Sequence, residues 1–218
     1  MSGYQVKYET VTVCGTDYLI RSLLDNQQFF DPYGDAEQSG ISPASWGMFG
    51  QVWPSARVLA KIMDSFDLVG KRVLEIGAGL ALASIVAHHH GGDVTVSDWH
   101  PLGPEFLREN LQLNQLGPLK YQTGDWAGAN PDLGQFDLII GSDILYERQQ
   151  PEQLAAFIHG HSAPTVEILI VDPDRGNRVA FCKAMARQGY SYSPRKTDTE
   201  LESGEDFKGR LLVFNRVD

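Results

Sequence analysis

The chain has 218 residues, of which 42% are hydrophobic and 21% are charged, and this balance fits one globular domain with or without a small extension. A formal net charge of −10 and the lack of a Lys- or Arg-rich run argue against binding to a nucleic acid, because phosphate backbones are held by clustered cations. An acidic surface instead favours cationic small molecules or basic protein segments.

The N-terminal part of the chain does not have the pattern of an α/β core. Residues 5–20 are rich in Val, Thr and Tyr and alternate in polarity around a turn signal at residues 14–17, which predicts a β-hairpin. Residues 25–45 are polar and rich in Gly, Pro and Asp, which predicts an irregular connection. We therefore expect residues 1–45 to form an N-terminal hairpin with a connecting extension, and residues 46–218 to form the main domain.

From Trp53 onward, helical and extended patterns alternate along the chain. Pro54 fits the first turn of a helix whose apolar residues recur at helical spacing. Further helices are predicted at residues 81–89, 104–114, 151–160 and 178–188, and strands at residues 72–76, 93–97, 119–123, 136–142 and 166–172. Residues 190–193 and 211–214 predict a final antiparallel pair with a charged loop between them. The alternation predicts an α/β fold: a Rossmann-like, seven-stranded and mostly parallel sheet, with helices on both faces and an antiparallel last strand.

The first strand of the predicted sheet ends in an acidic residue and a glycine loop. Glu75 is followed by Gly77-Ala78-Gly79, which opens the next helix, and glycines at such a turn let a ligand approach bare backbone. Glu75 would repel a pyrophosphate but not a ligand that carries an ammonium group and ribose hydroxyls, and S-adenosylmethionine has both. The alternatives are a dinucleotide-binding G-x-G-x-x-G turn, which has Leu82 in place of its third glycine, and a turn that binds no ligand.

Ligands of open parallel sheets bind beyond the carboxyl ends of the strands. The second strand is followed by Asp98 and Trp99, where an acid can hold a ribose diol; the alternative role for Asp98 is a helix cap. After the third strand, Asp125 can accept a hydrogen bond from an adenine amino group, and Trp126 can form an apolar wall. A simple turn is the alternative there.

The fourth strand ends at Ser142, so that Asp143 is expected at the mouth of the ligand crevice and Tyr146 on the turn that follows. The alternative is that Asp143 caps the next segment and that Tyr146 packs against the core. Upstream, Trp46 and Trp53 lie in a segment rich in Gly and Pro. Their aromatic faces can flank a sulfonium or an ammonium by cation–π attraction, although Trp46 can equally anchor this segment to the sheet.

Other features exclude functions or indicate the compartment. The run His88-His89-His90 closes a predicted helix without a carboxylate or cysteine at ligand spacing, so we expect no metal site. No G-x-S-x-G nucleophile motif is present. We expect no membrane partner, because no stretch is long and apolar enough to span a bilayer. Cys14 and Cys182 are far apart and no secretory signal is visible, so we expect a cytoplasmic protein.

Four motifs together carry a family resemblance: Trp53-Pro54-Ser55-Ala56, Leu74-Glu75-Ile76-Gly77-Ala78-Gly79, Asp125-Trp126 and Asp143-Ile144-Leu145-Tyr146. In order and spacing they resemble class I, seven-β-strand S-adenosylmethionine-dependent methyltransferases. The closer resemblance is to the D-x-x-Y group of protein lysine methyltransferases, whose bacterial members are often labelled nicotinamide methyltransferase-like. Asp172-Pro173-Asp174-Arg175 also resembles the D-P-x-R turn of the electron-transfer flavoprotein β-subunit lysine methyltransferase and its bacterial relatives. Ala81 departs from the family pattern, because many methyltransferases have a third glycine there.

The resemblance implies S-adenosylmethionine as the cofactor and a shared role for a set of residues in holding it: Glu75, Gly77, Asp98, Asp125 and Trp126. Our full candidate cofactor site adds Ala78, Gly79, Trp99 and Ser142. The resemblance further implies that Trp53 lies near the methionine end of the cofactor. Asp143 and Tyr146 are implied to stand between the sulfonium and the acceptor.

The expected reaction is methyl transfer to a lysine of a protein. A carboxylate such as Asp143 near the acceptor nitrogen stabilises the positive charge that moves from sulfur to nitrogen, but it also raises the pKa of the lysine ammonium. We therefore assign Asp143 to positioning and charge stabilisation rather than to general base catalysis. The alternatives are a methyltransferase for a small nitrogenous molecule and a non-catalytic S-adenosylmethionine-binding interaction module. The sequence does not indicate an oligomeric state.

Overall fold

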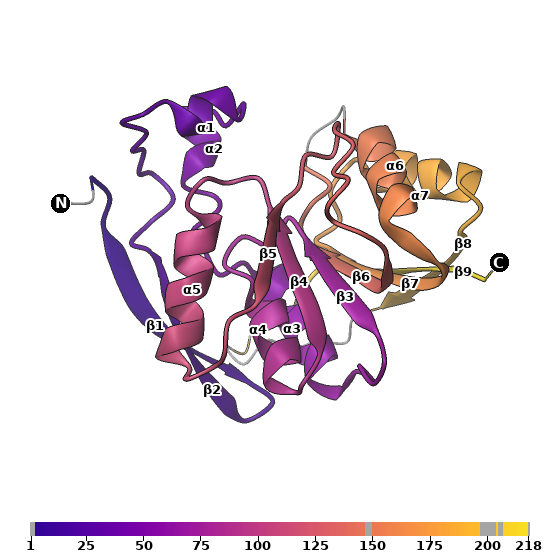
Figure 1. Cartoon of the computed structure of the whole chain (residues 1–218), viewed down its shortest axis with the longest axis horizontal. Coiled ribbons are helices and arrows are strands. Elements are labelled where there is room, and N and C mark those ends of the chain that lie inside the picture. The colour runs from indigo at the N-terminus through magenta and orange to yellow at the C-terminus, as the bar shows by residue number, and fades with distance from the viewer. Residues whose placement is uncertain (1–2, 147–149, 197–203, 205–206, 218) are drawn as a thin grey trace.

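The computed structural model describes residues 3–146, 150–196, 204 and 207–217. The strands of its central sheet are β3 (Arg72–Ile76), β4 (Asp93–Asp98), β5 (Lys120–Thr123), β6 (Phe136–Ser142), β7 (Ser162–Asp172), β8 (Ser191–Lys196) and β9 (Arg210–Arg216). They form one seven-stranded sheet in the order β5-β4-β3-β6-β7-β9-β8 (Figure 1). Strands β3 to β7 run parallel to one another, whereas β9 runs antiparallel to both β7 and β8. The predicted fold class is therefore confirmed.

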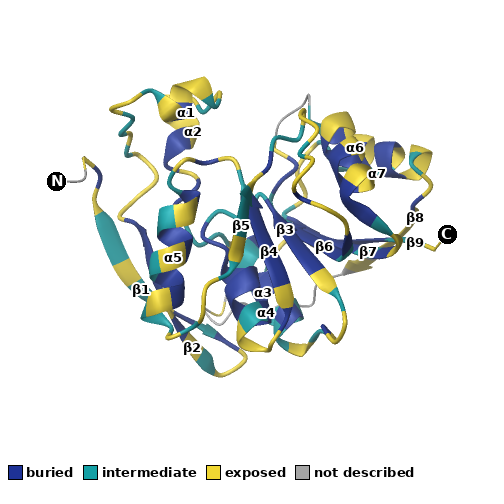
Figure 2. Ribbon diagram, in the orientation of Figure 1, coloured by how far each residue is buried: buried dark blue, intermediate teal, exposed yellow. Residues whose placement is uncertain are grey.

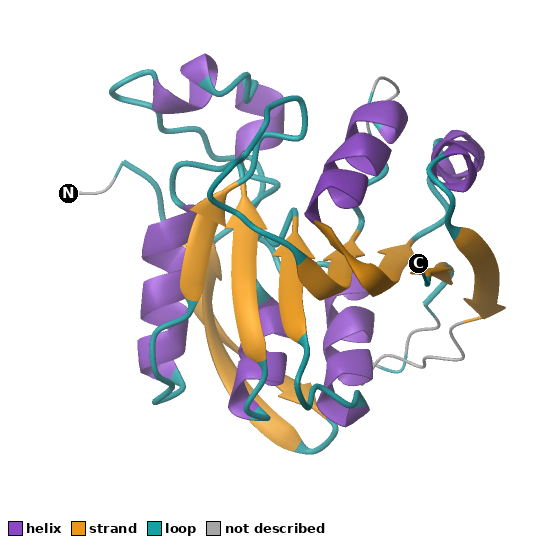
Figure 3. Ribbon diagram, turned by 45° about the vertical axis from the view of Figure 1, so that its right-hand side comes forward, coloured by secondary structure: helices purple, strands orange, loops and turns teal. Residues whose placement is uncertain are grey.

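Helices cover both faces of this sheet (Figure 3). They are α3 (Pro54–Ser65), α4 (Leu82–His89), α5 (Gly103–Leu113), α6 (Pro151–His161) and α7 (Arg178–Arg187). Because side chains alternate along a strand, Val73 of β3 belongs to the core beneath α3, α4 and α5, and its neighbour Leu74 belongs to the core beneath α6 and α7. The same alternation leaves the central strands buried from both sides (Figure 2), which explains their continuous apolar sequences.

The order of the strands reverses at β3. From β3 the chain moves outward through β4 to β5, then returns to place β6 on the other side of β3. The carboxyl ends of β3 and β6 therefore diverge at a topological switch point, which is where open α/β sheets bind ligands.

Strand β7 starts earlier than predicted and pairs irregularly with β6. Strand β7 begins at Ser162, before the predicted start at residue 166, and the β6–β7 register shifts between Phe136 and Leu138. The irregular pairing allows β7 to include Pro164, because a proline cannot donate to a regular ladder. Most of the charged loop predicted between the last two strands lies outside the described residues.

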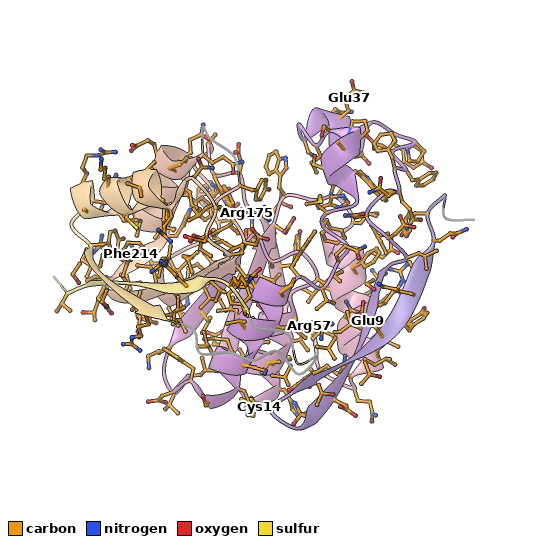
Figure 4. The ribbon with its side chains drawn as sticks, turned by 180° about the vertical axis from the view of Figure 1, so that it is seen from behind. Glu9, Cys14, Glu37, Arg57, Arg175 and Phe214 are labelled. Carbon is orange, nitrogen blue, oxygen red and sulfur yellow. The ribbon has the colours of Figure 1, made fainter. Side chains whose placement is uncertain are left out.

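The predicted N-terminal hairpin is confirmed and consists of β1 (Val6–Val13) and β2 (Thr16–Leu23). Cys14 and Gly15 both have positive φ, +48° and +88°, as a two-residue hairpin turn requires. The hairpin lies beside α5 (Figure 1) and shares its hydrophobic core with α3, α4 and α5. An ion pair between Arg57 Nη2 and Glu9 Oε2 at 3.4 Å joins α3 to β1 (Figure 4).

The connection after the hairpin, predicted to be irregular, contains two short helices, α1 (Asp35–Gln38) and α2 (Pro43–Trp46). Ser42 caps the second helix by accepting a hydrogen bond from the Ser45 N–H. The proposed division of the chain at residues 45/46 stays a prediction. The hairpin shares one hydrophobic core with the helices. The two parts therefore differ in their place along the sequence but do not pack as separate units.

Two asparagines of α5 and its C-terminus pair with the edge of β2. The Asn110 side chain accepts from the Arg21 N–H at 2.7 Å and donates to the Arg21 carbonyl at 3.3 Å. One helical turn later, Asn114 makes the same two bonds with Leu19, both at 2.9 Å. The amide side chains thus take the place of a neighbouring strand. They provide hydrogen-bond partners for the backbone N–H and carbonyl groups at the edge of β2 and attach the hairpin to the main fold.

We expect Asn110→Ala to lower the free energy of unfolding by about 2 kcal/mol, because the substitution leaves a buried backbone N–H and carbonyl of Arg21 without partners. Asn114→Ala is the matched control: Leu19 is 37% exposed, so water can replace the lost amide and the loss should stay below about 1 kcal/mol. Urea unfolding of both variants measures the difference. Equal losses would mean that burial of the β2 edge does not determine how much free energy of unfolding each substitution removes.

Candidate functional site

A cavity of about 620 Å³ lies over the switch point, at the carboxyl ends of β3, β4, β5 and β6. Its volume falls within the range of small-molecule sites. Nearly all sequence-predicted site residues line it together: Trp53, Gly77, Ala78, Gly79, Asp98, Trp99, Asp125, Trp126, Ser142, Asp143 and Tyr146. Trp46 is not part of the lining and is buried, in agreement with the packing role given above as its alternative.

The loop after β3 follows a left-handed path. Gly77 and Gly79 have φ of +58° and +52°, and Ala81 adopts the same hand at +57°. A Cβ on Gly77 would lie 2.7 Å from Ile144 Cγ2 and 3.5 Å from the ring of Trp126, so the loop needs glycine there for space as well as for conformation. At Ala81 the fold instead tolerates a buried methyl in a conformation that favours glycine.

Glu75 does not line the cavity, and its place in the cofactor site stays a prediction. Its side chain is buried, and Oε2 accepts a hydrogen bond at 2.9 Å from the Ser84 N–H in the first turn of α4. Burial raises the pKa of Glu75 to about 7. Glu75 therefore joins the end of β3 to the first turn of α4 beneath the loop.

Asp98 connects the loop to the neighbouring strand. Its Oδ2 accepts from the Gly79 N–H at 2.7 Å, and its Oδ1 accepts from the His100 N–H at 2.8 Å. The next helix begins at Gly103, with Leu102 at its cap position and no side-chain cap, so Asp98 is not the cap of α5. Burial raises the pKa of Asp98.

Trp99 and His100 join the sheet to the N-terminal extension. The Trp99 indole N–H donates to the Ser39 carbonyl. His100 stacks on Phe49 with 4.2 Å between ring centroids, and its Nδ1 accepts from the Leu102 N–H at 3.2 Å. Burial lowers the pKa of His100 to about 4, which makes this imidazole neutral near pH 7.

Sequence reasoning missed His100 and Phe49 as cavity residues. The aromatic and glycine-containing segment around Trp46 was a signal for Phe49, since it adjoins a tryptophan that was singled out. His100 gave no local signal, because its place depends on how the extension folds over the end of β4.

Asp125 is held in a tight turn after β5. Its Oδ1 accepts from the Ala127 N–H at 2.8 Å, and the Asn130 side chain bonds both its N–H and its carbonyl. This geometry agrees with the turn named above as its alternative role, yet the residue still lines the cavity. Trp126 beside it packs partly against the core beneath α6 and α7 and faces Gly77.

Asp143 follows β6 in a left-handed conformation with φ +54°, and its N–H donates to the Val171 carbonyl at 2.9 Å. A non-glycine residue held in this region is common at functional sites. Its carboxylate forms a two-point pair with Arg175, with Nε–Oδ1 at 2.8 Å and Nη2–Oδ2 at 2.9 Å; Arg175 is labelled in Figure 4. Tyr146 lines the same cavity and is 57% exposed.

Within the described ranges, no group of three or more His, Cys, Asp or Glu side chains is placed to hold a metal ion. Of the helices in that same part of the chain, none combines the length and the apolar character needed to cross a membrane.

We expect the stability of the protein to fall as the pH rises from about 4.5 to about 7, because folded Glu75 keeps a proton that the unfolded chain releases. The loss should be on the order of 3 kcal/mol. Glu75→Gln keeps an acceptor for Ser84 without the charge, so it should be more stable than the parent at pH 8 and similar at pH 4.5. Urea unfolding at both pH values checks this, and an unchanged pH dependence would contradict it.

We expect Gly77→Ala to lower the free energy of unfolding by about 2–3 kcal/mol, because it adds crowding against Ile144 to left-handed strain. Gly91→Ala is the control: Gly91 has φ +82° with nothing within 4 Å of the added Cβ, so it carries the strain alone, about 1 kcal/mol. Thermal and urea unfolding of both variants separate the two effects. If both variants lose the same free energy of unfolding, the close approach of Ile144 to Gly77 does not contribute to stability.

Comparison with known proteins connects this site to a family. A family model described as lysine methyltransferase matches residues 42–188. Protein N-lysine methyltransferase METTL21A of Danio rerio is 38% identical over 133 residues, which cover 56% of this chain and 60% of the relative. Histone-arginine methyltransferase METTL23 of Homo sapiens is 35% identical over 126 residues, covering 54% of this chain and 66% of that protein.

The electron transfer flavoprotein beta subunit lysine methyltransferase of Xenopus laevis is 30% identical over 151 residues, covering 66% of this chain and 55% of the relative. The chain thus covers less than two thirds of the length of each of these relatives.

Solved structures of low sequence identity share the fold. The 16S rRNA N2 G1207 methyltransferase RsmC of T. thermophilus, in complex with AdoMet and guanosine, aligns with a TM-score of 0.63 at 13% identity, covering 97% of this chain and 51% of that one. The ribosomal protein L11 methylase of Lactobacillus delbrueckii subsp. bulgaricus aligns with a TM-score of 0.61 at 16% identity, covering 97% of this chain and 100% of that one. With its family model matched over residues 42–188, the chain belongs to the lysine methyltransferase family.

Proposed function

We propose that this protein is an S-adenosylmethionine-dependent methyltransferase that methylates the side-chain amine of a lysine in a protein. The observation that carries the proposal is the cavity at the switch point, which is lined both by the Gly77–Gly79 loop with Asp98 and by Asp143 with Tyr146. Membership in the lysine methyltransferase family supports it.

The residues of the cavity fit S-adenosylmethionine. At Gly77 the space that a Cβ would need is already taken by Ile144, so the loop presents backbone rather than side chains. Asp98 uses each carboxylate oxygen once for a backbone N–H, and each oxygen keeps a further lone pair for a ribose hydroxyl. Asp125 and Trp126 would hold the adenine, and the loop with Trp53 would hold the methionine part. When bound, S-adenosylmethionine supplies a methyl group activated by a sulfonium.

The chain's own residues would align the acceptor with that methyl group. Alignment alone can supply about 7–11 kcal/mol of the barrier. Asp143 would stabilise positive charge as it develops on the acceptor nitrogen, and the Tyr146 hydroxyl would orient the amine. Trp53, which also lines the cavity, would exclude water from this end.

A protein acceptor is supported by the wall that the N-terminal extension builds. Residues 39–53 contribute much of the cavity lining. The connection that leads to them carries Asp25, Asp31, Asp35 and Glu37, and residues 22–56 contain no Lys or Arg, which suits a basic protein segment beside the cavity. We accordingly propose that residues 1–45 act as the part that selects the acceptor. Cys14 and Cys182 remain thiols, which supports action in a reducing compartment such as the cytoplasm.

The test is transfer of labelled methyl from S-adenosylmethionine into a host-cell extract that is then separated into protein and small-molecule fractions. We expect a discrete labelled protein whose hydrolysate contains methyl-lysine. Asp143→Asn should lower the rate about a hundredfold, because it removes charge stabilisation in the transition state, while S-adenosylhomocysteine affinity changes only a few fold. Asp132→Asn, an exposed carboxylate outside the cavity lining, is the control and should leave the rate unchanged.

Each other result points to a different function. Label found among small molecules alone would favour a metabolite methyltransferase. Methyl-arginine in the labelled protein would favour the activity named for the METTL23 relatives. Binding of S-adenosylmethionine without any transfer would favour a non-catalytic interaction module.

A further inference from the structure

The Asp143–Arg175 pair is built into the fold rather than formed by two mobile surface chains. Asp143 is fixed by its left-handed conformation and by its hydrogen bond to the carbonyl of Val171 in β7. Arg175 is fixed by its own N–H, which donates to Oδ1 of the fully buried Asp172 at 3.1 Å. Both side chains line the cavity, and their side chains are 13% and 43% exposed. Two parallel N–H···O bonds give the pair a single geometry.

The charges around the pair are themselves largely matched. Asp174, in the same turn, pairs with Arg178 of α7 and lies 3.9 Å from Arg210 of β9. Asp172 lies below the turn, and burial raises its pKa. Among the described residues, the guanidinium of Arg175 is therefore the cation that compensates Asp143 at the cavity.

This compensation bears on a conflict in the chemistry of amine methylation. The nucleophile is the neutral amine, whereas a lysine side chain in water is an ammonium with a pKa near 10.4. An uncompensated carboxylate beside the acceptor would hold the ammonium and raise its pKa further. Pairing with a guanidinium weakens this effect, because the attraction of the carboxylate for a positive charge is then partly cancelled and the ammonium is favoured less.

We propose that Arg175 is a positioning residue that holds Asp143 in a charge-compensated pair, so that the methyl acceptor reacts in this cavity as an uncharged amine. The inference rests on the proposed methyltransferase function. The ammonium loses its proton to water, the amine nitrogen forms a bond to the methyl carbon, and the carbon–sulfur bond breaks with its electron pair going to sulfur. The positive charge ends on the methylated nitrogen, and Asp143 with Arg175 stays net neutral throughout.

Charge compensation can be measured without turnover by comparing two ligands that differ in one charge, the sulfonium S-adenosylmethionine and the thioether S-adenosylhomocysteine. Arg175→Gln leaves Asp143 uncompensated, so the affinity ratio should move toward the sulfonium by about three- to tenfold. Asp143→Asn leaves Arg175 uncompensated and should move the ratio the other way. The double variant restores neutrality and should return to the parent ratio, which loss of structure alone would not produce. Calorimetry gives all the affinities.

The second readout is the pH dependence of methyl transfer to the protein labelled in the extract assay. Arg175→Gln should shift the alkaline rise in kcat upward by about one pH unit and lower both kcat and the acceptor KM, because the ammonium form is then held more tightly. Arg175→Lys keeps the charge and should keep the profile of the parent. Arg187→Gln is the control for charge alone, since Arg187 pairs with Glu152 on the outer helices and does not line the cavity.

The two proposals fail in different ways. If the parent protein transfers no methyl group, the proposed function fails, whatever the affinity ratios are. If the parent transfers methyl but Arg175→Gln leaves both the affinity ratio and the pH profile unchanged, the inference about Arg175 is overturned. Should Arg175→Gln not fold, Asp143→Asn decides alone, because an unchanged ratio in that folded variant contradicts the proposal.

Discussion

The hydrogen bond between the Gly79 N–H and Asp98, 2.7 Å long, links the two strands on which the cavity depends. A left-handed loop leaves backbone N–H groups without partners in a helix or strand. Asp98 of the adjacent strand β4 accepts a hydrogen bond from one of them, the Gly79 N–H. Beneath the loop, Glu75 accepts a hydrogen bond from the Ser84 N–H of α4 at 2.9 Å. The side chains of Asp98 and Glu75 thus join the end of β3, the start of α4 and the end of β4. The backbone of residues 77–79, held in this way, forms part of the cavity lining.

The carboxylates at the cavity are satisfied in different ways, and this difference divides the cavity into two ends. Asp98 and Asp125 accept from backbone N–H groups of their own turns or of the loop, and their remaining lone pairs can accept from neutral donors such as hydroxyl or amino groups. Asp143 faces a full positive charge on Arg175. The end with Asp98 and Asp125 offers acceptor oxygens, which suits a nucleoside. The end with the Asp143–Arg175 pair suits an acceptor group whose charge changes during the reaction.

The N-terminal hairpin belongs to the same hydrophobic core as the helices that cover the sheet, yet it precedes the family match at residue 42. Its edge is paired by asparagines of α5, and its connection closes over the cavity through Trp99 and His100. The part of the chain that we propose for acceptor selection is thus coupled to folding. Changes of specificity in this segment would therefore act on stability as well.

The sequence by itself determined the features that depend on neighbouring residues: the alternation of strands and helices, the hairpin turn, and the polar residue after each strand that lines the cavity. These follow from local spacing, because side-chain periodicity and glycine conformation are properties of short segments. The tertiary structure alone decided that Glu75 is buried below the loop, that His100 joins the cavity, and that Arg175 meets Asp143 from the turn after the neighbouring strand β7. Such contacts depend on which strands become neighbours and on how the extension packs over their ends, and the pattern within a single segment does not encode either.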